Sequence, residues 1–207
     1  MHVTRHSHVI DPVLLDSLWS LYARAYLPTA ESTVTHEMLD RLEFNEQMAL
    51  HANRAWVVWN DKAPVAMTLI STDVRSTRWL SDVYFKKHFP ERFAKGQIHY
   101  IVWAVVDPDH VASGAVIHLG KHALAAEARD GALLVFDTPE SNQPNDTGGA
   151  AELLVRLARM VSDADLLSIS TQRYYAIDFK PEPDSRAGAV RDVPESDVSQ
   201  APAVLFG

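Results

Sequence analysis

One strand-like stretch followed by a helix-like stretch is the clearest place for chemistry in this sequence. Residues 97–106 form a nearly continuous apolar run, rich in β-branched and aromatic residues, which indicates a buried strand that stops at Asp107. Residues 111–130 carry apolar side chains at helical spacing, with Ser113 and Gly114 near their start. A helix that follows a strand closely directs free backbone N–H groups and its positive dipole end beyond the strand. The sequence therefore predicts an anion-binding site at this turn.

Two titratable side chains are adjacent in the same strand-like run. His99 can change its charge near neutral pH, and Tyr100 follows it directly. Because side chains alternate along a strand, we expect His99 and Tyr100 on opposite faces, so that only one of them faces a given ligand. The alternative for His99 is a half-buried structural histidine.

No metal site is predicted. His118 and His122 are four residues apart on one expected helix, which is a spacing that metal-binding histidines use. The sequence offers no evident third ligand and lacks the HExxH pattern, so we interpret both as solvated helix histidines. The acidic residues and histidines between residues 36 and 51 lack a Glu-x-x-His pair and are interpreted as a solvated face.

The composition limits the class of protein. A chain of 207 residues with 47% hydrophobic residues suits one domain, and a net charge of −8 argues against a nucleic-acid partner. The absence of cysteine excludes disulfides, a zinc–thiolate site and a thiol nucleophile. No apolar run approaches the ~20 residues that span a bilayer, and no apolar signal segment is visible, so we expect a cytoplasmic protein without a membrane partner.

Two helices and a hairpin are expected before the central strand. The first helix should begin at Asp11, whose side chain can cap it, and end at Pro28. The second should begin near Thr35. Residues 54–59 and 64–72 should pair as a hairpin. The inward-facing positions expected on the second helix are Met38, Leu39, Leu42 and Met48.

A long connection precedes the central strand, and alternating elements follow it. Residues 73–96 should hold a short helix around residues 79–89, and such long connections often form a lid or a binding wall. Its expected inward-facing residues are Trp79, Val83 and Phe85. After the helix of residues 111–130 we expect a short buried strand at 132–136, a polar loop at 141–149, a helix at 150–161 and a strand-like segment at 166–179.

This order of elements predicts one α/β (α+β) domain with a mixed central sheet and helices on both faces. We expect a flexible N-terminus over residues 1–10, the domain over residues 11–179, and a mobile proline-rich tail over residues 180–207.

In element order and in the motif region of residues 106–116, the chain resembles the GNAT superfamily of acyltransferases, over roughly residues 10–180. In that family the backbone amides of a glycine-containing turn after the central strand hold the pyrophosphate of acyl-CoA. Pro108 and Gly114 fit the pattern. Val111 stands where the family has Arg or Gln, and Ala112 and Val116 stand at two glycine positions. Val116 is β-branched, so we expect it to crowd a phosphate and to tolerate no positive φ.

The resemblance implies a set of residues that contact the acyl donor, the strand before the turn pairing with its pantetheine arm. They are Ala104, Val105, Val106, Val111, Ala112, Ser113, Gly114, Ala115, Val116 and Asn142. Within the superfamily the chain is similar to acyl-homoserine-lactone synthases and long-chain N-acyl amino acid synthases, in which a long loop precedes the central strand. The donor in those enzymes is often an acyl carrier protein.

The resemblance also implies catalytic roles. A backbone N–H near Ala104 or Val105 would polarise the thioester carbonyl, and Tyr174 or Tyr175 would protonate the leaving thiolate. Tyr100 occupies the position of the glutamate base of histone-acetylating members, which leaves His99, Asp73 or a chain of waters as the base. The alternatives are sheet aromatics for both tyrosines and ordinary turn chemistry for Asn142.

The implied activity is transfer of an acyl group from acetyl-CoA, a longer acyl-CoA or an acyl carrier protein to an amine of a small molecule. The acidic net charge favours a cationic acceptor. One alternative is a GNAT-like domain that has lost catalysis, its pocket filled by side chains such as Trp103. Another is an acyl-thioester decarboxylase or hydrolase on the same fold. The apolar chain end at residues 203–206 and the five tryptophans are compatible with a homodimer.

Overall fold

The computed structural model describes residues 1–32, 38–138, 149–171 and 176. It divides the chain into two compact units, Met1–Ser170 and Thr171–Gly207. The first unit contains every helix and strand of the described residues. The expected tail of residues 180–207 lies outside the described residues.

A five-stranded mixed sheet forms the centre of this unit, and its strands lie in chain order from β1 to β5. The strands β1 to β4 are antiparallel to one another, and β5 is parallel to β4. The expected hairpin is present as β2 and β3, and the expected central strand is β4. The strands are β1 (His2–Ser7), β2 (Asn53–Asn60), β3 (Ala63–Ser71), β4 (Ile98–Val106) and β5 (Leu133–Val135).

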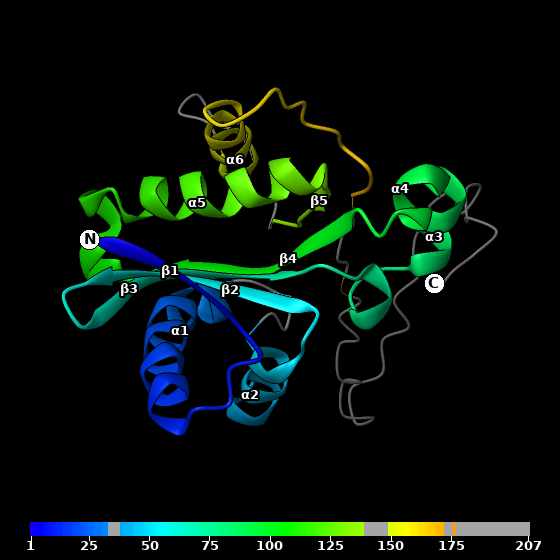
Figure 1. The fold of residues 1–207 in the computed structure, drawn as a ribbon. Helices are drawn as coiled ribbons and strands as arrows, with labels where there is room; N and C mark the ends of the chain where they lie inside the picture. The colour runs from blue at the N-terminus through cyan, green and yellow to red at the C-terminus, as the bar shows by residue number, and fades with distance from the viewer. Residues whose placement is uncertain (33–37, 139–148, 172–175, 177–207) are drawn as a thin grey trace, which may run out of the picture. The chain divides into compact units, whose positions relative to one another are not determined.

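Helices cover both faces of the sheet, as the order of elements predicted (Figure 1). On one face lie α1 (Pro12–Ser32) and α2 (Arg41–Ala49), and on the other lies α5 (Ala115–Asp130), with α6 (Ala150–Arg159) packed against α5. The connection before β4 holds the short helices η1 (Val74–Ser76), α3 (Asp82–His88) and α4 (Pro90–Ala94). The 3-10 helix η2 (Pro108–Ser113) joins β4 to α5.

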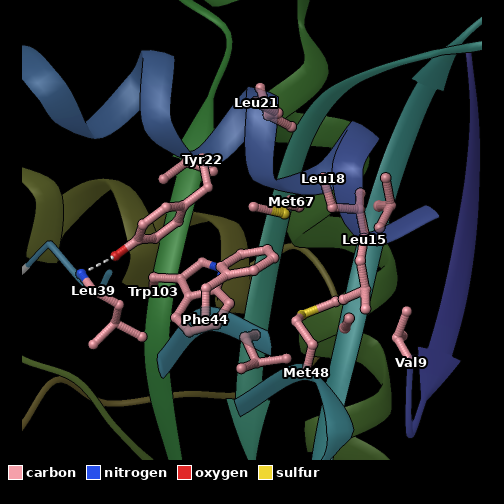
Figure 2. Close-up of a cluster of buried hydrophobic side chains, with 14 residues drawn as sticks. Val9, Leu15, Leu18, Leu21, Tyr22, Leu39, Phe44, Met48, Met67 and Trp103 are labelled. Carbon is pink, nitrogen blue, oxygen red and sulfur yellow. Dashed lines mark hydrogen bonds between the residues drawn. The ribbon is translucent and has the colours of Figure 1, made fainter. Parts of the chain in front are cut away.

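The core between the sheet and α1 and α2 is built on aromatic side chains (Figure 2). Tyr22, Phe44 and Trp103 are buried and lie with ring centroids 5.2 to 5.3 Å apart. The Leu39 backbone N–H donates a hydrogen bond to the Tyr22 hydroxyl oxygen over 2.8 Å. This bond ties the segment before α2 to α1, so both helices are held on the face of the sheet that carries Trp103.

The second helix begins later than the sequence prediction, at Arg41 rather than near Thr35, which lies outside the described residues. Asp40 caps this helix, because its side chain accepts from the Glu43 N–H while the Glu43 side chain accepts from the Asp40 N–H. Met38 and Leu39 precede the helix, so they do not belong to its inner face, which Phe44 and Met48 form. Leu42, expected inside, is 67% exposed, and Phe44 is fully buried instead.

The N-terminus is a strand, which corrects the expected flexible segment of residues 1–10. Residues 2–7 pair with β2 in register from His2 with Trp59 to Ser7 with Arg54. The Trp59 indole N–H donates to the Thr4 hydroxyl over 2.7 Å. An edge strand can be held by backbone pairing and polar contacts. The sequence of β1 accordingly lacks the apolar alternation that would have indicated a strand.

Three further expectations about elements are corrected. Helix α1 continues past Pro28 to Ser32, and a proline near the C-terminal end of a helix removes one backbone donor and leaves the earlier turns intact. Val83, expected inside, is 70% exposed on α3, whereas Phe85 is buried as expected. Residues 166–171, expected to begin a strand, form none, and two consecutive leucines there break the alternation that one buried face requires.

Candidate active site at the end of strand β4

The two parallel strands at the end of the sheet separate after a short pairing. Ile98, His99 and Tyr100 of β4 lie opposite Leu133, Leu134 and Val135 of β5. Strand β5 then ends, whereas β4 continues to Val106. Residues 101–106 of β4 therefore extend along an edge that β5 does not pair. The resemblance to the GNAT superfamily implied that the pantetheine arm of the donor pairs with this part of the strand.

A β-bulge lies in β4 just beyond this point. Against β3, Ile70 lies opposite Ile101 and Leu69 lies opposite Trp103, so that Val102 is the extra residue. As a result Val102 and Trp103, although consecutive, both pack toward the α1 and α2 side. The Thr68 hydroxyl donates to the Trp103 carbonyl oxygen over 2.8 Å and fixes the strand after the bulge. The bulge reorients the backbone of residues 102–105 relative to a regular strand.

The turn after β4 ends in a left-handed glycine that starts α5. Gly114 has φ 79° and is the N-cap residue, and no side chain caps this helix end. A Cβ at Gly114 would meet no atom within 4 Å, so the glycine serves backbone conformation and not space. Among the described residues, no side chain therefore caps the first amides of α5, as the predicted anion site requires.

Val116 does not have the backbone conformation that we expected to exclude it. It lies in the first turn of α5, and the positive-φ residues other than glycine in the described chain are His8 and Asp61. Within this turn, Gly114 is the residue with a positive φ. The other predicted donor-contact residues of this turn are largely accessible, since Val111 is 64% exposed and Ala112 and Ser113 are also exposed, while Ala115 is fully buried.

An ion pair joins the turn after β4 to helix α1, which lies on the face of the sheet opposite α5. The Arg24 guanidinium on α1 donates to the Asp107 carboxylate over 2.6 Å. Asp107 is 4% exposed, and its other carboxylate oxygen accepts from the Asp109 N–H over 3.0 Å. The buried charge that follows β4 is thereby compensated, so Asp107 presents little net repulsion to an anion at the start of α5.

Tyr100 faces away from α5, and its hydroxyl donates to the Asp137 carboxylate oxygen Oδ1 over 2.6 Å. Tyr100 is 4% exposed and packs in a cluster with Val74 and Phe85, with the Trp79 ring centred 6.1 Å away. Asp137 is exposed. Asp137 was not among the residues predicted from the sequence, because nothing in the spacing links it to Tyr100.

His99 lies on the opposite face, as strand alternation predicted, and it is more buried than expected. It is 3% exposed and its Nδ1 atom is hydrogen-bonded to the Glu127 carboxylate of α5. Arg54 of β2 pairs with Glu127 over 3.3 Å and with Asp130 over 2.6 Å. The hydrogen bond from Arg54 is the main reason that the pKa of Asp130 is lowered. His99 is therefore hydrogen-bonded to a carboxylate that also pairs with Arg54.

The hydrogen-bonded network around Glu127 also has the composition of a metal site, which was not predicted from the sequence. Ligand atoms of His99, Glu127 and Asp130 lie within 4.8 Å of one another. However, the Arg54 guanidinium already compensates both carboxylates. An open hollow of about 340 Å³ lies beside it, lined by residues that include Lys95 and Gln97. It is at the C-terminal end of α5, away from the turn at Gly114.

The remaining residues predicted for the site lie either outside the described residues or away from the turn at Gly114. Tyr174, Tyr175 and Asn142 lie outside the described residues. Asp73, named as a candidate base, accepts from the Arg75 side chain over 2.8 Å, and this bond is the main reason that its pKa is lowered. A lowered pKa makes it a weaker base. His118 and His122 are exposed on α5, as expected for solvated histidines.

No protein-family model matches the sequence, and no curated protein is similar to it at a significant level. Among solved structures the chain is similar to an aminoglycoside acetyltransferase from an uncultured soil metagenomic sample, with 11% identity over 85% of this chain and 95% of that one, at a TM-score of 0.47. It is also similar to a ribosomal-protein-alanine N-acetyltransferase from Brucella melitensis, with 14% identity over 83% and 97%, at a TM-score of 0.46.

A third similar structure is an aminoglycoside 6'-N-acetyltransferase from Acinetobacter haemolyticus, with 12% identity over 87% of this chain and 100% of that one, at a TM-score of 0.47. The names of all three proteins describe acetyltransferases. Among the described residues, no helix combines the length and apolarity needed to cross a membrane.

Proposed function

We propose that this protein is an N-acyltransferase that moves an acyl group from an acyl thioester to an amine. The observation that carries the proposal is the open edge of β4 over residues 101–106, which ends at the uncapped N-terminus of α5. An extended thioester arm can pair with such an edge as an added strand. The diphosphate at its other end would then lie on the first amides of α5.

The β4 bulge supports the placement of the reacting carbonyl. The N–H groups of Ala104 and Val105 follow the bulge, in the part of β4 that β5 does not pair. One of them would donate to the thioester carbonyl oxygen as negative charge develops on it. Acetyl-CoA, a longer acyl-CoA and an acyl carrier protein all present the same thioester arm, and all three stay candidate donors. The acceptor is proposed to be a small-molecule amine.

One observation favours a second candidate, a GNAT-like domain that binds a ligand without catalysis. Trp103 is 3% exposed and fills the space between β4 and the helices α1 and α2 (Figure 2). Its ring lies 5.3 Å from those of both Tyr22 and Phe44. A side chain that fills this face leaves less room for an acceptor there. In that case the acceptor would have to approach elsewhere along β4.

A thermal-shift screen with acetyl-CoA, decanoyl-CoA and free CoA tests the proposal. A ligand at ~100 times its Kd stabilises the fold by about 2.7 kcal/mol, which raises Tm measurably. A shift with any of the thioesters, together with release of CoA thiol when amines are added, is the expected result. A shift without thiol release for any amine would favour the binding domain. The absence of a shift with all three ligands would contradict binding of a CoA thioester.

A further inference from the structure

We infer that the Asp137 carboxylate binds the cationic amine of the acceptor and that Tyr100 is the residue that positions this carboxylate. The inference rests on the proposed function and names the acceptor-binding group of the same site. It also narrows the acceptor to primary amines that are protonated in solution.

Tyr100 and Asp137 lie where strands β4 and β5 separate. Tyr100 is the last residue of β4 that pairs with β5, where it lies opposite Val135. Asp137 follows Val135 by two residues. Both side chains therefore lie at the fork where β4 and β5 separate, at the start of the edge along which the thioester arm is proposed to lie.

Tyr100 and Asp137 also lie on the face of the sheet opposite α5. Tyr100 and Val135 belong to the cluster formed with Val74 and Phe85, whereas Leu134 packs with the cluster under α5. The pair thus lies on the side away from α5. An acceptor that approaches Asp137 would reach β4 from the face opposite to the helix that holds the diphosphate, so donor and acceptor would not compete for space.

The hydrogen bond from the buried Tyr100 orients the Asp137 carboxylate. The Tyr100 ring is held by packing, so its hydroxyl is fixed, and it donates to Oδ1 of Asp137 over 2.6 Å. The carboxylate itself is exposed. Among the described residues no Lys, Arg or His lies within ion-pair distance of Asp137. An oriented carboxylate without a cation of its own is suited to an ammonium group, which offers three N–H donors.

Acyl transfer to the bound ammonium group releases one proton and a free thiol. The ammonium group first binds Asp137 and loses one proton to solvent by way of the carboxylate. The amine nitrogen then attacks the thioester carbon, a C–N bond forms and the C–S bond breaks. The second proton of the nitrogen passes to the thiolate. The products are an amide, a free thiol and one released proton, and no oxidant or metal is needed.

The test measures CoA thiol release from acetyl-CoA with butylamine, putrescine and spermidine as protonated acceptors, and with methoxyamine, which is neutral near pH 8. For Asp137→Asn we expect kcat/KM for the protonated amines to fall about 10- to 100-fold, the effect of one charged hydrogen bond. The KM for acetyl-CoA and the rate with methoxyamine should change little. Tyr100→Phe should show a smaller loss with the same preference for protonated amines. Asp163→Asn, another exposed aspartate, is the matched control.

Three results would overturn the inference. The first is an unchanged kcat/KM for the protonated amines in Asp137→Asn, and the second is an equal loss with methoxyamine. The third is a wild-type protein that binds acetyl-CoA and acylates none of these amines. This third result leaves the donor half of the proposed function standing. Failure of wild type to bind any acyl-CoA, measured separately by thermal shift, is instead a failure of the proposed function itself.

Discussion

His99 on β4 and Glu127 on α5 form a hydrogen-bonded pair that is almost completely buried. It joins the strand whose far end carries the candidate site to the helix whose N-terminus completes that site. Because Arg54 of β2 also pairs with Glu127, three elements meet at this one carboxylate. The contact therefore holds α5 to β4 at the end of the helix opposite to Gly114.

Removing the Glu127 carboxylate should destabilise the fold strongly. In Glu127→Ala the His99 ring and the Arg54 guanidinium lose a buried partner, and breaking such a pair costs about 3–5 kcal/mol. Urea unfolding measures the change. Glu91→Ala, at an exposed position on α4, is the control and should change the free energy of unfolding by less than about 0.5 kcal/mol. Equal effects of the two substitutions would show that the pair does not hold β4 to α5.

Asp130 should make stability depend on acid pH. Its folded-state pKa is lowered, mainly by the hydrogen bond from Arg54, so the unfolded chain binds its proton more tightly. The resulting stabilisation is present above the unfolded pKa of about 3.9 and is lost as pH falls through the lower folded value. Urea unfolding of wild type and Asp130→Asn between pH 7 and pH 3 should show a difference that shrinks toward pH 3. A difference that stays constant over this range would contradict the assignment.

Gly114→Ala should destabilise the turn by backbone strain alone. A Cβ there meets no neighbouring atom, so the cost is that of a left-handed non-glycine residue, about 1–2 kcal/mol. Gly114→Asn should cost less, because asparagine adopts this conformation more readily. Thermal or urea unfolding compares the two variants. If alanine is tolerated as well as asparagine, positive φ is not what this position requires.

The central part of the fold could be predicted because its signals are local. The apolar run of β4 and the stripe of α5 are visible in consecutive residues, and so is the β2–β3 hairpin. The cap of α2 was also readable in principle, since Asp40 and Glu43 have the spacing of a capping box. It was missed because the prediction placed the helix start earlier.

The pairs that organise the site could not be predicted. Tyr100 and Asp137 are 37 residues apart, and His99 and Glu127 are 28 apart, so only the fold brings each pair together. The β4 bulge could not be predicted either, because its position depends on the register with β3. Spacing within the sequence identified His99 and Tyr100 as candidates, and contacts across the sheet decide what each can do.

The measurement that tests the central claim most directly is the Kd of acetyl-CoA for a pair of variants at one exposed position, Ser113. In Ser113→Asp a negative charge lies beside the start of α5, which should stabilise the helix by roughly 0.3–1 kcal/mol and repel a bound diphosphate. We expect calorimetric titration to give at least about a tenfold weaker Kd for Ser113→Asp, although its Tm is unchanged or higher, and a Kd close to wild type for the neutral Ser113→Asn. Equal Kd values for the two variants would contradict a donor site at this turn.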